Sequence, residues 1–87
     1  MRNHYKKALK NIFHENLFHR RVAMGITQEE MASRLAMANR TYVELDHGKT
    51  CCSAVTLVLF LIYICPDPIK FLEELRDAFE NEGSEAA

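Results

Sequence analysis

The stretch that decides the fold of this 87-residue chain is TQEEMASRLAMANRTYVELDHGKT, residues 27–50. Thr27, followed three residues later by a glutamate, forms a capping box: the hydroxyl accepts from a free backbone N–H and the glutamate reaches back to the cap. A helix is therefore predicted over residues 28–35. A second short helix is predicted over about 38–45, ended by Gly48, which tolerates the left-handed conformation.

Longer helices are predicted on both sides of this stretch. Between Tyr5 and Met24, apolar residues recur mostly at steps of three and four, as on one helix face. That face comprises Leu9, Ile12, Phe13, Leu17, Val22 and Ala23. Residues 51–65, CCSAVTLVLFLIYIC, carry no charge. A membrane helix needs about 20 apolar residues, so this run is too short to span and is predicted to be a buried helix starting near Ser53.

A last helix is predicted from Ile69 to about Glu80, because Asp67 supplies an N-cap and Pro68 a first-turn proline. Its apolar stripe is Ile69, Leu72, Leu75 and Phe79. Residues 81–87 are interpreted as a disordered acidic tail. We therefore expect one all-α domain over residues 1–87, with a compact five-helix core at about 5–80.

The composition favours a small core without disulfides. Hydrophobic residues make up 48% of the chain, and the odd set of Cys51, Cys52 and Cys65 contains no C-x-x-C pair. The first residues lack the apolar run and cleavage site of a secretory signal. We expect a cytoplasmic protein without membrane association.

Charge divides the chain into two halves. Residues 1–50 carry nine Lys or Arg against five Asp or Glu, whereas residues 51–87 carry two against seven. The positive half contains residues 27–50 and would suit nucleic acid, although the overall pI near 6.4 is well below the roughly 9 of a strongly basic binder. Lys6, Lys7 and Lys10 are interpreted as an ordinary solvated face, with contact to a nucleic-acid backbone as the alternative.

The pattern resembles the helix-turn-helix domain of the phage-repressor and Cro type, the xenobiotic-response-element family of bacterial regulators. The resemblance covers residues 12–64 and includes GITQEEMASRLAMA, NRTYVELDHGK and a following Ser-x-x-Thr-Leu at residues 53–57. The matching positions are Gln28, Ala32, Leu35, Tyr42, Leu45, Asp46 and Gly48. The resemblance implies a bacterial or phage-type transcriptional regulator, repressor-like, that binds double-stranded DNA at a near-palindromic operator.

In that geometry the second helix of the pair lies in the major groove with its N-terminal residues toward the base edges. The residues expected to read bases are Asn39, Arg40, Thr41 and Glu44. Arg40 can form a bidentate pair with guanine, and Asn39 with adenine. Glu44 can accept a hydrogen bond from cytosine, or it is instead paired with Arg40. The expected phosphate contacts are Gln28, by the resemblance, and Lys49 and Thr50 after the helix. The resemblance also implies a structural ion pair between Arg21 and Asp46.

Two departures from the family bear on this interpretation. Ala36 stands where the turn usually has glycine, so either a positive φ costs about 1 kcal/mol or the turn is built differently. Cys51, Cys52 and Ala54 occupy a loop where relatives often carry lysine or arginine. Fewer phosphate contacts predict weaker binding and a shallower dependence on salt.

The uncharged helix is expected to contribute to a homodimer. Val55, Leu59 and Ile62 form a stripe where relatives often have charged residues, and exposed apolar patches mark association sites. The alternative cover for this stripe is the last helix of the same chain. A competing function is an antitoxin-like subunit whose C-terminal helices bind a partner protein. No residue cluster suggests an enzyme, a metal site or a cofactor.

Overall fold

The computed structural model describes residues 2–86, with side chains described for residues 3–81. This part of the chain is all-α, with five helices and no strand. The helices are α1 (Arg2–Met24), α2 (Gln28–Arg34), α3 (Asn39–Asp46), α4 (Ala54–Leu59) and α5 (Pro68–Ala86), and α4 continues into the π-helical turn η1 (Phe60–Ile64). None of the helices in this part of the chain is both long and apolar enough to cross a membrane.

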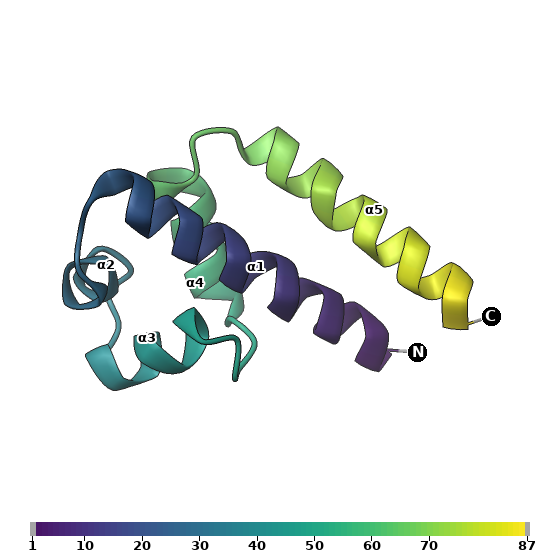
Figure 1. The fold of residues 1–87 in the computed structure, drawn as a ribbon, viewed down its shortest axis with the longest axis horizontal. Helices are drawn as coiled ribbons and strands as arrows, with labels where there is room; N and C mark the ends of the chain where they lie inside the picture. The colour runs from purple at the N-terminus through teal and green to yellow at the C-terminus, as the bar shows by residue number, and fades with distance from the viewer. Residues whose placement is uncertain (1, 87) are drawn as a thin grey trace.

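The two long helices, α1 and α5, run antiparallel and pack against each other (Figure 1). The short helices α2, α3 and α4 gather around the other part of α1, so the start of α1 and the end of α5 lie together at the opposite end of the molecule (Figure 1). This arrangement gives an elongated shape of 41 × 25 × 20 Å.

The core lies where α1, the α2–α3 pair, η1 and α5 meet. Its aromatic centre is a row of rings: Phe13 lies 5.0 Å from Phe60, and Phe60 lies 5.5 Å from Phe71, between ring centroids. Around them are the buried side chains of Leu17, Met31, Ala32, Leu35, Tyr42, Leu45, Ile64 and Leu75. Both α2 and α3 therefore pack against the same core as the long helices.

Local signals place most helix starts. Ser53 caps α4, since its hydroxyl accepts from the Thr56 N–H at 3.2 Å. Asp67 caps α5 by accepting from the Lys70 N–H at 3.1 Å, which confirms the expected cap, and the helix begins at Pro68, one residue before the expected Ile69. The π turn was not predicted. In it the Cys65 N–H donates to the Phe60 carbonyl at 2.8 Å, and the Arg20 guanidinium donates to the Ile64 carbonyl at 3.2 Å.

The expected buried faces of α1 and α5 were wrong in part. Val22 and Ala23 are exposed, and the core-facing residue of the last turn of α1 is Met24, which continues the face of Phe13 and Leu17. Because 3.6 residues make one turn, Val22 and Ala23 lie off that face.

On α5 the buried stripe is Phe71, Leu75 and the half-buried Phe79, whereas Ile69 and Leu72 are exposed. The side of α5 that meets α1 is therefore centred on Phe71. The helix also continues to Ala86, beyond the expected end near Glu80 and into the residues expected to be disordered. Ala87 lies outside the described residues.

Candidate nucleic-acid interface

The start of α2 is fixed by Thr27. Its hydroxyl oxygen accepts from the Glu30 N–H at 3.1 Å, as expected for a capping box. The second half of the motif differs, because the Glu30 carboxylate accepts from the Thr27 hydroxyl at 3.3 Å. Thr27 and Glu30 are thus joined by two hydrogen bonds across the first turn of α2, one through the Glu30 N–H and one through its carboxylate.

The turn between α2 and α3 contains Ala36 in the left-handed region, with φ of 54°. The Ala36 N–H donates to the Ser33 carbonyl at 3.1 Å and the Met37 N–H to the Ala32 carbonyl at 3.0 Å, which is the Schellman pattern. α1 and α3 end in the same pattern with glycines, Gly25 and Gly48, at the left-handed position. Of the two alternatives for Ala36, the strained turn is the one adopted.

The first turn of α3 faces solvent. Asn39, Arg40 and Thr41 are exposed, and the hydrogen bonds among residues 3–81 involve none of their side chains. Ala38, the N-cap, has no side chain able to accept from the free N–H groups at this end. The exposed side chains and the uncapped backbone donors are therefore both available to a ligand.

Glu44 lies one turn further along α3 and is half-buried. Of the two roles considered for it, an ion pair with Arg40 does not occur among the described residues. Lys49 and Thr50, which follow α3, are both exposed.

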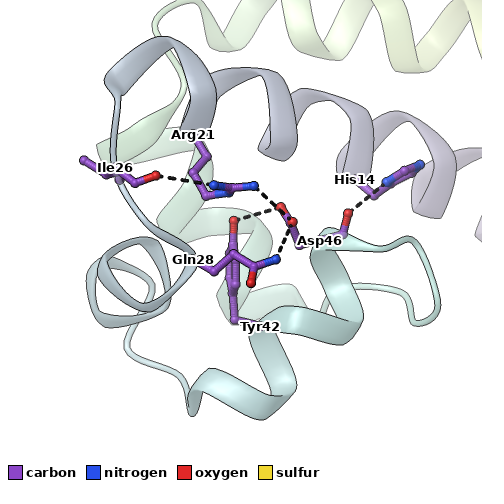
Figure 2. A network of polar contacts seen from close by, with 6 residues as sticks. All are labelled: His14, Arg21, Ile26, Gln28, Tyr42 and Asp46. Atoms are coloured by element: carbon purple, nitrogen blue, oxygen red, sulfur yellow. Dashed lines mark hydrogen bonds and ion pairs between the residues drawn. The ribbon is translucent and has the colours of Figure 1, made fainter.

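The other end of α3 is tied to the core through Asp46, whose carboxylate is 2% exposed (Figure 2). One carboxylate oxygen accepts from the Gln28 amide at 2.9 Å and lies 3.5 Å from the Arg21 guanidinium. The other accepts from the Tyr42 hydroxyl at 3.1 Å. Burial, and then the neighbouring Asp46 charge, raise the pKa of Tyr42 well above its usual value, so the phenol remains a donor.

Three further contacts of α1 side chains extend this network. The Arg21 guanidinium also donates to the Ile26 carbonyl at 3.4 Å and lies 5.5 Å from the centre of the Phe18 ring. The Nδ1 of His14 lies 3.2 Å from the Asp46 carbonyl oxygen, and since a carbonyl only accepts, Nδ1 carries the hydrogen. The orientation of α3 is therefore set by donors from α1 and α2 as well as from α3 itself.

The structure brings together Arg21 and Asp46, the pair implied by the family resemblance, and adds Gln28, which was expected at a phosphate. Gln28 is half-buried and directs an amide hydrogen to Asp46. The sequence contains no local signal for this contact, because the two residues are 18 positions apart.

No known protein family, curated protein or solved structure gives a significant match to this chain. The assignment of a role to the α2–α3 pair therefore depends on its geometry.

The stripe expected at a dimer interface is only partly exposed. Val55 and Ile62 are 69% and 63% exposed, whereas Leu59 is half-buried and packs against the core. Val58, one residue before Leu59, is the exposed residue at that level of the helix. α5 packs on α1 and leaves Val55, Val58 and Ile62 uncovered, so the chain does not cover this surface with its own last helix.

The three cysteines are free thiols. Cys52 is half-buried, and burial followed by the adjacent Cys51 raises its pKa to about 12. Such a thiol is a poor nucleophile and a poor metal ligand at neutral pH, because both roles need the thiolate. Within the described residues, no three His, Cys, Asp or Glu side chains lie close enough to hold a metal ion.

Proposed function

We propose that the protein is a sequence-specific DNA-binding transcriptional regulator in which residues 27–50 form a helix-turn-helix of the phage-repressor type. In this proposal α3 enters the major groove, and Asn39, Arg40 and Thr41 meet base edges. Lys49 and Thr50 contact phosphates on one side of the groove.

The observation that carries the proposal is the contrast between the two ends of α3. At its C-terminal end Asp46 is buried and accepts from three side chains, whereas its first turn is exposed, uncapped and free of internal hydrogen bonds. A helix that must read DNA needs both properties, because its base-contacting side chains must be unoccupied while its orientation stays fixed.

The structure bears on the roles that this proposal gives to Glu44 and Gln28. Glu44 remains available to accept from a cytosine amino group, since no cation among the described residues is paired with it. Gln28 acts first as a donor to Asp46, and its remaining amide hydrogen is the one available to a phosphate.

We also propose a symmetric homodimer formed through Val55, Val58 and Ile62. These residues follow one face of α4 and η1 and are exposed. Such a dimer would match a near-palindromic operator if its two recognition helices lie about 34 Å apart, one turn of duplex. A dimer also combines two modest affinities at high effective concentration.

The test is selection of bound sites from a random duplex DNA pool, using the full chain. Enrichment of a near-palindrome with half-sites about one helical turn apart supports the proposal. A variant with Asn39→Ala and Arg40→Ala serves as control and should enrich nothing. A pool that remains random with the unaltered protein would reject DNA reading by α3.

The second candidate function is an antitoxin-like subunit that binds a partner protein. It is favoured by exposed apolar side chains beyond the proposed dimer stripe, namely Tyr63, Ile69 and Leu72. Light scattering separates the two candidates. If the exposed apolar surface binds a different partner protein, the chain remains a monomer at micromolar concentration. Selection from the DNA pool then enriches single half-sites or no site at all.

A further inference from the structure

A surface hollow of about 590 Å³ lies between the start of α1 and the segment after α3. Four lysines line it, Lys6, Lys7 and Lys10 from α1 and Lys49 from the segment after α3, together with Asn3 and Thr50. We infer that this hollow binds a phosphodiester group of the DNA backbone, outside the base pairs that α3 reads. The inference rests on the proposed function, since it concerns the same DNA.

The lysines of α1 share one side of the helix. Asn3, Lys6, Lys7 and Lys10 have the spacing i, i+3, i+4 and i+7, which is one helix face. The opposite face, with Ala8 and Leu9, packs toward the core, and the Tyr5 ring meets the Phe79 ring edge-on at 5.0 Å. Packing of α1 on α5 therefore determines which way the lysine face points.

The described lining of the hollow is positively charged. None of its residues is acidic, and the ion pairs among residues 3–81 include none of its four lysines. Like charges at neighbouring helix positions repel one another. An anion placed among them removes that repulsion, and the polar groups of Asn3 and Thr50 add hydrogen-bond donors for its oxygens.

The uncharged residues that follow Thr50 also border the hollow, since Cys51 lies on its wall. Lys6, Lys7 and Lys10 bring positive charge to the same place from α1. Most of the positive charge of the hollow is thereby supplied by α1, and the segment after α3 contributes Lys49.

A phosphodiester fits this hollow better than a small free anion. The lysines come from two segments 39 or more positions apart in sequence and are exposed or half-exposed, so they surround an open surface and not a closed pocket. DNA brings several phosphates along one strand, and each neutralised phosphate releases condensed counterions.

The test compares two variants that each lose two positive charges at exposed helical positions. Lys6→Gln/Lys7→Gln alters the hollow, and Lys70→Gln/Arg76→Gln alters α5, where neither residue lines it. Binding to the selected duplex is measured at several salt concentrations. Two lost phosphate contacts make the slope of log K against log salt shallower by about 1.8 for the first variant only. Between 50 and 200 mM salt, that variant then loses about 12-fold less affinity than the unaltered protein.

The salt-dependence measurement has three informative outcomes. The expected slope change with an unaltered preferred site supports the hollow as a backbone contact. If both variants keep the slope of the unaltered protein, the hollow is not a phosphate site and the proposed reading by α3 stands. If the unaltered protein binds no duplex at all, the proposed function fails and this inference fails with it.

A titration with inorganic phosphate, followed by NMR of the amides around Lys6 and Lys49, distinguishes the source of the phosphate. One result would overturn the inference and assign the hollow to a free anion. In that case the amide shifts saturate below 1 mM phosphate, the Lys6→Gln/Lys7→Gln variant no longer shows this saturation, and the same variant leaves the salt slope of DNA binding unchanged.

Discussion

Arg21 and Asp46, 25 positions apart, form an ion pair of 3.5 Å whose side chains are 17% and 2% exposed. The other ion pair among the described residues, Arg76 with Glu80, is shorter at 3.2 Å, but its side chains are 78% and 65% exposed. Burial decides which of the two matters for stability, because a carboxylate left unpaired in the interior loses its hydration without compensation.

Arg21→Ala should lower the free energy of unfolding by about 3 kcal/mol, the lower end of the range for breaking a buried pair, since Gln28 and Tyr42 still donate to Asp46. Urea unfolding followed by circular dichroism measures it. Arg76→Ala is the matched control and should change stability by less than about 1 kcal/mol. Equal effects of the two substitutions would show that the Asp46 carboxylate does not depend on Arg21.

Ala36→Gly should stabilise the protein by about 0.5–1 kcal/mol. A φ of 54° costs about 1–2 kcal/mol for alanine, and glycine removes this cost. Glycine also raises the conformational entropy of the unfolded chain, which offsets part of the stabilisation. Ala78→Gly, at a half-buried position in the interior of α5, should instead destabilise by about 0.5–1 kcal/mol. Thermal melts of both variants give the sign, and a loss of stability in Ala36→Gly would contradict the strained turn.

Arg40→Ala should cost about 1–3 kcal/mol of binding on the selected site and relax the preference at one base pair. The reason is the exposed, unpaired position of this guanidinium on the first turn of α3. Competition binding against single-base variants of the site measures the effect. An equal loss on every sequence would assign Arg40 to a phosphate.

Val55→Glu/Ile62→Glu should convert the proposed dimer to a monomer and abolish binding to the selected DNA site, with helical content unchanged. Both side chains are mostly exposed, so the fold itself accepts the charges. Leu59→Glu serves as a contrasting variant and should unfold the domain, because Leu59 packs against the core. Light scattering and circular dichroism separate these outcomes; a double variant that remains dimeric places the interface elsewhere.

Cys52 should react with iodoacetamide on the order of a hundredfold more slowly than an ordinary thiol at pH 8. A pKa near 12, against about 9 for the unfolded chain, lowers the thiolate fraction about a thousandfold, and the higher intrinsic nucleophilicity of a more basic thiolate offsets part of this loss. The protonated thiol stabilises the fold fully below pH 9, and that contribution is lost as the pH rises toward 12. Mass spectrometry after timed alkylation, with guanidinium-unfolded protein as the reference, checks this. Equal rates in both states would contradict burial of Cys52.

The helix starts could be read from the sequence because their causes are local. Thr27 and Asp67 accept from N–H groups three residues ahead, and such short-range contacts leave a pattern that is visible in the sequence. The rotation of each long helix about its axis is a different matter. Whether Met24 or Val22 faces inward, and whether Phe71 or Ile69 does, depends on where the neighbouring helix lies, and this is decided by packing of the whole core.

The same distinction applies to the candidate site. The exposed first turn of α3 follows from the spacing of Leu35, Tyr42 and Leu45, which are buried in one core. The contact between Gln28 and Asp46 and the meeting of the α1 lysines with Lys49 join residues distant in sequence. They require the angle between helices, which no periodicity encodes.

The antiparallel packing of α1 and α5 has a consequence for the order of events during synthesis. α1 leaves the ribosome before α5, but Phe13 remains without its full set of neighbours until Phe71 of α5 has emerged. The row of rings joining Phe13, Phe60 and Phe71 can then close only late in translation of this domain. Until that point the nascent chain exposes apolar side chains of α1 and η1, which makes this interval the one in which chaperones would engage it.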